Sequence, residues 1–315
     1  PREEGRVALR HAGEGHLLTV APTGAGKGIG AVIPALLDHK GPAVVVDPKG
    51  ENAAVTAKAR AAMGQDLVVL DPFQIVDPAC LPGGTNRPLD SLNPLDLVRT
   101  APKGQRAEEA AMLATLLTDP RHGEDSRNLF WHHCCQQMLT GLISMSVHTD
   151  SSVAPNLPAL RKMISTPMRG DPSKFDLLIR ELSSIEDDEW QHAVGVLWGR
   201  AGEMIGSIMG MVQQALGFVR SGAVQDAIGE SSFRLQDVTD GKLMTIYLVL
   251  PPDKLESCSS LMRLWVGTLM SAILRRTHQP SVPTLFLLDE AAQLGTLPQL
   301  RQALTLMRGF GLQTW

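Results

Sequence analysis

Short runs of apolar residues alternate with segments of helical spacing in the first and last parts of the chain. The runs are rich in β-branched residues and apolar throughout, which is typical of parallel strands buried on both faces. They predict strands at Leu17–Val20, Ala43–Asp47, Leu67–Leu70, Leu243–Leu250, Thr284–Leu288 and from Leu312 onward. The segments between them predict helices at Ile29–His39, Glu51–Met63, Ser257–Arg275 and Pro298–Met307, with a bend at Pro34. This alternation predicts an α/β fold in which helices flank a mostly parallel, twisted sheet.

The middle of the chain has a different pattern. Residues 76–94 are rich in Pro, Gly and Asn and predict a loop. No strand pattern follows until after Ala227, and the helical pattern predicts Ala107–Leu117, Asn128–Val147, Leu157–Ile164, Lys174–Ser184, Asp187–Trp198 and Glu203–Phe218. We therefore predict two domains: residues 1–95 and 228–315 form the α/β domain, and residues 96–227 form an inserted all-α domain.

Composition narrows the possible functions. The chain is 43% apolar and 20% charged, so a packed core is expected. Its net charge of -4 argues against a surface that is basic overall, so any contact with nucleic acid should be confined to a groove or channel. The four cysteines have no framework spacing, which fits a reduced, cytoplasmic setting. We see no apolar stretch long enough to span a membrane and expect the chain to be the soluble part of a longer protein.

A glycine-rich loop follows the first predicted strand. In the segment Ala21–Gly28, three glycines precede or flank Lys27, and a predicted helix begins directly afterwards. Glycines allow backbone N–H groups to converge on phosphate oxygens, and the lysine supplies positive charge at the β- and γ-phosphates. The segment departs from the general phosphate-loop pattern at Ala21, normally glycine, and at Gly28, normally a hydroxyl residue that binds magnesium. The nucleotide-binding residues predicted from it are Thr23, Gly24, Ala25, Gly26, Lys27, Gly28 and Ile29.

Two carboxylates end the buried strand Thr284–Leu288. In phosphate-loop ATPases an aspartate at this place binds magnesium, and the glutamate after it polarises the attacking water. Asp289 is therefore the predicted metal ligand, and Glu290 and Lys27 are predicted catalytic residues. Solvated charges at a strand end are common, but the pairing of this motif with the glycine loop favours an ATPase that uses ATP and Mg²⁺.

Several motifs together resemble the type IV secretion coupling proteins, the conjugative DNA-transfer ATPases. In that family, alanine at the first loop position and glycine after the lysine are usual, so both departures become points of agreement. The family usually carries Phe where Ala291 stands. The matching landmarks, in order, are Ala21–Gly30, Val32–Pro34, Asp47–Glu51, Leu70–Phe73, Asn93–Leu95, Leu288–Pro298 and Arg308–Gly311.

The resemblance implies a RecA-like P-loop NTPase fold in an ATPase anchored in the bacterial inner membrane, whose cytoplasmic part forms a hexameric ring. It implies as partners single-stranded DNA with its relaxase, or protein effectors, and the inner-membrane components of the type IV secretion system. It also implies that Arg308 reaches the nucleotide of a neighbouring subunit. Judged from the residues alone, Arg308 could instead offset a helix dipole. The glutamine that senses the γ-phosphate would follow Trp315, so we expect this chain to hydrolyse ATP poorly by itself.

Alternatives remain open at this stage. A related ring DNA translocase would share the nucleotide motifs, although Gly28–Gly30 and Asp47–Glu51 favour a coupling protein. A recruitment platform could bind nucleotide without efficient hydrolysis and dock substrates through its helical domain. The Asp47–Glu51 segment has good turn chemistry and is interpreted as a structural or subunit-contact element. His132–Cys135 are consecutive helical residues whose four side chains cannot converge, so at most two of them could join a metal site built elsewhere, and no metal site is predicted there.

Overall fold

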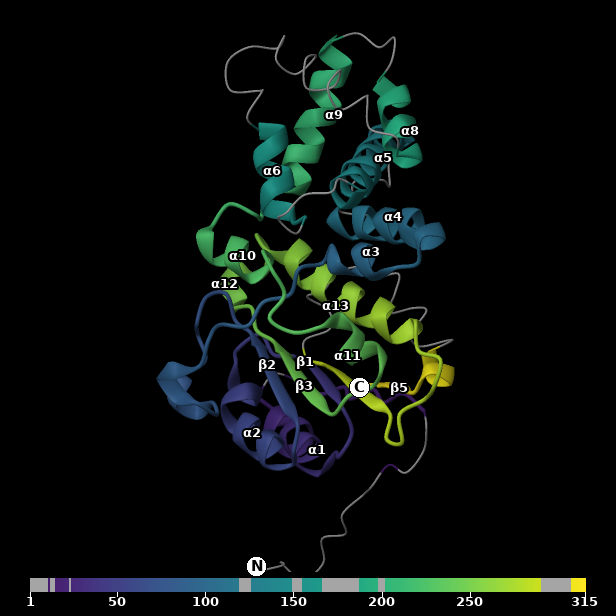
Figure 1. Ribbon diagram of the computed structural model, residues 1–315. Helices are drawn as coiled ribbons and strands as arrows, with labels where there is room; N and C mark the ends of the chain where they lie inside the picture. Colours follow the sequence, from purple (N-terminus) through teal and green to yellow (C-terminus); the bar gives the residue numbers. More distant parts are fainter. Residues whose placement is uncertain are drawn as a thin grey trace, which may run out of the picture.

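The computed structural model describes residues 11, 15–22, 24–118, 126–148, 155–165, 187–197, 202–289 and 307–315. The predicted helix Lys174–Ser184 lies outside the described residues, as does Pro298–Met307 except for its last residue. A five-stranded sheet lies in the lower half of the view, between helices on its two faces (Figure 1). Its strands are β1 (Ala43–Val46), β2 (Asp66–Leu70), β3 (Met244–Leu248), β4 (Thr284–Leu288) and β5 (Leu312–Thr314).

The strands are ordered β2-β3-β1-β4-β5, and every neighbouring pair is parallel. This confirms the predicted parallel sheet flanked by helices. β1 and β2 are consecutive in sequence, but β3 lies between them. Side chains alternate between the two faces, as strand geometry requires. On β1, Ala43 and Val45 belong to one buried cluster, whereas Val44 and Val46 belong to the other.

The prediction of a strand at Leu17–Val20 is wrong, because these residues form no strand. The backbone N–H of Leu17 donates to the carbonyl of Thr314 over 2.9 Å, which places the segment beside β5. However, Leu18 and Val20 are 88% and 86% exposed. The segment therefore lacks the burial and cross-strand packing that stabilise a strand.

Two helical elements cover the first face of the sheet. A π-helical turn, η1 (Gly28–Val32), leads into α1 (Ile33–Asp38), and α2 (Glu51–Ala62) packs beside α1 (Figure 1). The N–H of Ile33 donates to the carbonyl of Gly28, five residues back. Pro34 follows in the first turn of α1, where a missing N–H is tolerated. The predicted helix is confirmed as η1 followed by α1, whereas the bend expected at Pro34 stays a prediction.

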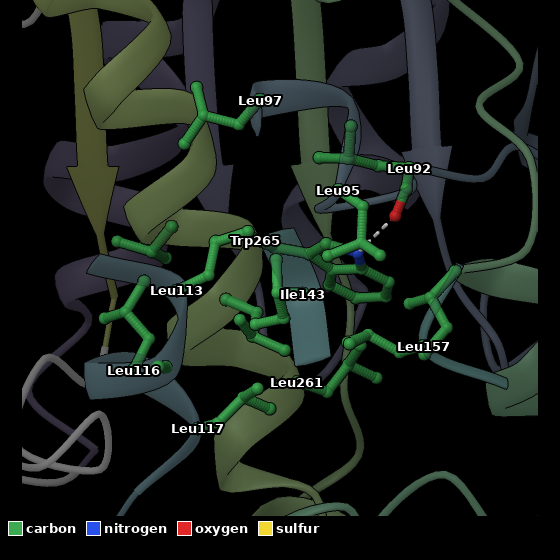
Figure 2. Close-up of a cluster of buried hydrophobic side chains, with 14 of the residues drawn as sticks. Leu92, Leu95, Leu97, Leu113, Leu116, Leu117, Ile143, Leu157, Leu261 and Trp265 are labelled. Carbon is green, nitrogen blue, oxygen red and sulfur yellow. Dashed lines mark hydrogen bonds between the residues drawn. The ribbon is translucent and has the colours of Figure 1, made fainter. Parts of the chain in front are cut away.

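The second face is covered by α13 (Ser259–Leu274), with α11 (Leu235–Thr239), α3 (Asp96–Thr100) and α4 (Arg106–Leu117) around it (Figure 1). Buried residues occur on all sides of α13 because it is enclosed between these helices and the sheet. Figure 2 shows the centre of this core, where Trp265 is fully buried among leucines. Its indole N–H donates to the carbonyl of Leu92 over 3.3 Å. The hydrogen bond satisfies a polar group that burial would otherwise leave unpaired.

An outer group of helices stacks beyond α3 and α4 (Figure 1). It consists of α5 (Ser126–His148), α6 (Leu157–Ser165), α8 (Asp188–Leu197) and α9 (Gly202–Ala215), each of which was predicted within a few residues. Short elements that the pattern did not predict are α3, α10 (Gly222–Ala227), α11, α12 (Pro252–Leu255), η2 (Pro78–Cys80), η3 (Gly84–Asn86), η4 (Lys103–Gln105) and η8 (Met307–Phe310).

One buried cluster extends from the second face of the sheet into the outer helices. The division into an α/β domain and an inserted domain at residues 96–227 therefore stays a prediction. No helix among the described residues combines the length and apolarity that a membrane span requires.

Candidate functional site

The glycine loop forms a tight turn before η1. Gly24 and Gly26 have φ angles of +80° and +81°, in the left-handed region that other residues rarely adopt. The N–H of Ala25 donates to the carbonyl of Pro22 over 3.2 Å, and the N–H of Gly30 donates to the carbonyl of Gly26 over 2.7 Å. Alternation of left- and right-handed residues turns successive N–H groups toward one side of the chain, which creates a concavity that suits an anion.

Lys27 stands at the junction of this loop and η1. Its ammonium group donates to the carbonyl of Ala21 over 3.0 Å, so the side chain folds back over the loop. Ile29, which follows in η1, is 81% exposed. Six of the seven predicted nucleotide-binding residues thus lie consecutively in the glycine turn and the start of η1. The seventh, Thr23, lies outside the described residues.

The direction of α1 places this loop toward one edge of the sheet. α1 ends at Asp38, and a short link leads directly into β1 at Ala43. The carboxyl end of α1 therefore lies near the amino edge of the sheet, and its first turn points toward the carboxyl edge. Val32 and Leu36 pack in the same buried cluster as Leu287 of β4. The loop and the carboxyl end of β4 consequently share one side of the molecule.

Two aspartates follow neighbouring strands at this carboxyl edge. Val46 of β1 is paired in register with Leu288 of β4, so the residues after them, Asp47 and Asp289, lie side by side. The side-chain alternation of both strands puts the two aspartates on the face that carries α1 and α2. Asp289 is half-buried, whereas Asp47 is only 1% exposed.

The environment of Asp47 is set by the start of α2. Its carboxylate accepts a hydrogen bond from the N–H of Ala53 over 2.8 Å and another from Nδ2 of Asn52 over 3.2 Å. Burial raises the pKa of Asp47 to about 6, and the neighbouring charge of Asp289 adds to the increase, while the two hydrogen bonds oppose it. The interpretation of this segment as a structural or subunit-contact turn did not predict that this carboxylate is buried. The two-residue alternation along β1 was the available signal.

A line of buried hydrogen bonds continues inward from Asp47. Oγ1 of Thr56 donates to the carbonyl of Asn52 over 2.6 Å and lies 2.7 Å from the hydroxyl of Tyr247 on β3. Asn52, Thr56 and Tyr247 are all at most 3% exposed. Because a buried polar group without a partner is destabilising, the chain of partners fixes the geometry of Asp47. Lys49, in the loop after β1, and Glu51, the first residue of α2, are exposed.

The structure does not bring every predicted site residue to this edge. Glu290 lies outside the described residues, as does the side chain of Arg308. The backbone of Arg308 belongs to η8, immediately before β5. Since Leu312 of β5 is paired with Thr284, the first residue of β4, Arg308 lies at the amino edge of the sheet. Asp289 is at the opposite edge, so Arg308 is remote from the glycine loop of its own chain.

No group of three His, Cys, Asp or Glu side chains in the described part of the chain could hold a metal ion by itself. Cys134 and Cys135 are buried in α5, and burial raises the pKa of the Cys135 thiol to about 12. This thiol is therefore a poor metal ligand or nucleophile at neutral pH. A cation at the carboxyl edge would need oxygen atoms from a ligand or from water in addition to the two aspartates.

The parallel sheet and the glycine loop at its carboxyl edge define a P-loop NTPase fold. Solved structures of a plasmid coupling protein, TrwB, have the same fold. The structure of TrwB in complex with ADP and Mg²⁺ matches with a TM-score of 0.56 and 14% identity, over 97% of this chain and 67% of TrwB. The structure with the non-hydrolysable ATP analogue ADPNP matches with a TM-score of 0.55 and 14% identity, over 89% of this chain and 64% of TrwB.

The chain belongs to the type IV secretory system conjugative DNA transfer family, whose model matches residues 3–315. The conjugal transfer protein TraG of Escherichia coli is 27% identical over 98% of this chain and 48% of its own length. The protein VirD4 of Rhizobium radiobacter is 28% identical over 96% of this chain and 41% of its own length. The chain thus spans about half the length of the curated relatives that it matches.

Proposed function

We propose that this chain is the nucleotide-binding part of a coupling ATPase, which recruits substrates to a type IV secretion channel and drives their transfer by hydrolysing ATP. The observation that carries the proposal is the position of the glycine loop. It enters α1 on the same face and at the same edge of the sheet as Asp289. Ligands of open α/β sheets bind at this carboxyl edge, and helix starts there favour phosphate groups.

The residues present fit a nucleoside triphosphate. The left-handed conformations of Gly24 and Gly26 direct backbone N–H groups toward an anion, and Lys27 adds a positive charge beside them. In this proposal the loop N–H groups of residues 24–29, together with Thr23, hold the phosphates. Lys27 stabilises the charge that develops on the β- and γ-phosphates. ATP with Mg²⁺ supplies the phosphoryl group to be transferred to water.

Two acidic residues complete the proposed set within one chain. Asp289 follows β4 and would hold the magnesium ion, and Glu290 would orient and deprotonate the attacking water. Arg308 lies at the amino edge, so it can only serve the nucleotide of another copy. We propose that the whole protein forms a ring, a homo-hexamer, in which Arg308 of one copy reaches the nucleotide of the next.

The names of two relatives support a role in transfer through a secretion system. TraG is a conjugal transfer protein, and the VirD4 of Bartonella quintana is a type IV secretion system-coupling protein that is 23% identical over 95% of this chain and 45% of its own length. We propose that the whole protein binds single-stranded DNA with its relaxase, or protein effectors, and meets the inner-membrane components of the secretion system. In this proposal the chain lies on the cytoplasmic side of the membrane.

The test is ATP turnover by the full-length protein, with and without single-stranded DNA. Glu290→Gln should abolish turnover and leave ATP binding intact, because it removes only the base. The exposed Lys40 offers a matched surface control, and Lys40→Ala should turn over like the wild type. If Glu290→Gln hydrolyses ATP at the wild-type rate, the proposed ATPase is wrong.

A further inference from the structure

The ends of β1 and β2 carry the same dipeptide, Asp-Pro. Asp47 follows β1 and Asp71 follows β2, and they are 1% and 8% exposed. Each carboxylate accepts a backbone N–H from the segment after it: Ala53 donates to Asp47 over 2.8 Å, and Val76 donates to Asp71 over 2.9 Å. The two aspartates therefore share a buried place after a strand and a backbone donor, although only Asp47 also accepts from an asparagine side chain.

Their surroundings across the sheet differ. β1 pairs directly with β4, whereas β3 and β1 separate β2 from β4. Neighbouring strands lie about 4.8 Å apart. Asp47 is thus one strand away from Asp289, and Asp71 is three strands away. Only Asp47 lies where it could share a ligand with the proposed magnesium-binding aspartate.

The glycine loop lacks one of the usual magnesium ligands of a phosphate loop. Residue 28 is glycine, so the position after Lys27 offers no hydroxyl to a magnesium ion. Magnesium requires six oxygen ligands, and Asp289 supplies one carboxylate. The carboxylate of Asp47 has lone pairs beyond those that receive the hydrogen bonds from Ala53 and Asn52. Two carboxylates side by side repel each other, and a divalent cation relieves that repulsion.

We propose that Asp47 is a second acidic residue of the nucleotide's magnesium site, acting beside Asp289 on the ion or on the water bound to it. In this proposal the carboxylate of Asp47 supplies the oxygen ligand that a hydroxyl at residue 28 would otherwise supply. This inference rests on the nucleotide-binding function proposed above. The buried chain through Asn52, Thr56 and Tyr247 holds the Asp47 carboxylate in place.

The test measures Mn²⁺ affinity by electron paramagnetic resonance in the presence of saturating ADP, with Mn²⁺ standing in for Mg²⁺. Asp47→Asn should weaken Mn²⁺ binding about tenfold, the lower end of the range for residues that support a metal site. Asp289→Asn should weaken it at least as much. Asp71→Asn is the matched control and should bind Mn²⁺ like the wild type. ADP affinity without metal should be the same in all four proteins.

The possible failures are distinguishable. If Asp289→Asn loses Mn²⁺ affinity and Asp47→Asn does not, the role of Asp47 is wrong and the nucleotide site stands. Equal losses of Mn²⁺ affinity in Asp47→Asn and Asp71→Asn would also overturn the role of Asp47. The loss would then come from disturbing any loop after a strand and not from a missing metal ligand. If the wild type binds no ADP, the proposed function itself is wrong. Should Asp47→Asn fail to fold, Asp47→Ser keeps an acceptor for the Ala53 N–H and must show the same loss.

Discussion

Arg276 donates a hydrogen bond from its guanidinium group to the hydroxyl of Thr284, over 2.8 Å. The same guanidinium also donates to backbone carbonyls of α11 and of the turn before β5, among them Val238 and Phe310. Arg276 is 7% exposed, and burial lowers its pKa to about 10. One buried cation therefore joins the start of β4, the end of α11 and the turn that contains Arg308.

We expect Arg276→Met to lower the free energy of unfolding by about 2–4 kcal/mol, because several buried acceptors lose their donor. The exposed Arg234 is the control. It pairs with Asp237 over 2.7 Å while 80% of its own side chain is exposed, so Arg234→Met should lose only about 1 kcal/mol or less. Hydrogen exchange should show β5 opening more readily in Arg276→Met alone. Equal stability of the two variants would contradict the anchoring role of Arg276.

Gly141 allows α5 and α8 to approach closely. A Cβ atom added at Gly141 would lie 2.5 Å from Cβ of Ala193 and 3.0 Å from the carbonyl oxygen of Glu189. Gly141→Ala should therefore destabilise the protein by about 1–3 kcal/mol through overpacking. Gly206 in α9 is exposed, and an added Cβ meets nothing within 4 Å, so Gly206→Ala should stabilise the protein by about 0.5–1 kcal/mol. Chemical denaturation compares the two, and a stabilised Gly141→Ala would refute the close packing.

Side chains cap the outer edge of the sheet at β2. The N–H of Val69 donates to Asp90 over 2.8 Å, and Arg87 donates to the carbonyl of Leu67 over 2.6 Å. Unpaired groups on an edge strand promote association between sheets. Asp90→Ala should therefore increase self-association, as measured by light scattering on gentle heating. Asp66 lies at the exposed start of β2 and provides the control: Asp66→Ala should scatter like the wild type.

His39 should make stability depend on pH. Burial lowers the pKa of His39 below its ordinary value of 6.5. The unfolded chain therefore binds more protons than the folded one as the pH falls through 6.5, and folding stability decreases. Asp47, whose pKa is raised to about 6 from 3.8, acts in the opposite direction below pH 6, because there the folded state holds the extra proton. The loss of unfolding free energy from pH 7.5 to about 6 should be smaller in His39→Gln than in the wild type. An equal loss would show that another group is responsible.

The strongest local patterns predicted most of the fold. The continuous apolar runs at β1 and β4 and the long apolar pattern of α13 each favour one environment, because burial of such residues stabilises the fold. The segment Leu17–Val20 has the same kind of pattern, yet it lies beside β5 with Leu18 and Val20 exposed. The insertion of β3 between β1 and β2 depends on contacts distant in sequence, which local pattern does not encode.

The candidate site was predicted in part. Motif spacing identified the glycine loop and Asp289, and the structure places them at one edge. Whether those residues hold a nucleotide stays a prediction, as do the roles of Thr23, Glu290 and Arg308. The buried chain from Asp47 to Tyr247 was not predicted, because it pairs residues about two hundred positions apart. Arg60 was missed for a similar reason: it lies in an alanine-rich helix but is fully buried, where it donates to Thr245 of β3 over 2.9 Å.

The most direct test of the central claim is calorimetric titration of the protein with ATP and Mg²⁺, compared with Lys27→Ala. The wild type should bind one nucleotide per chain. Lys27→Ala should bind about tenfold to a hundredfold more weakly, because one charge-assisted hydrogen bond to phosphate is lost. Lys40→Ala, which removes an exposed lysine near the far end of α1, should bind like the wild type. Equal affinity of Lys27→Ala and the wild type would contradict the assignment of this loop as the phosphate-binding site.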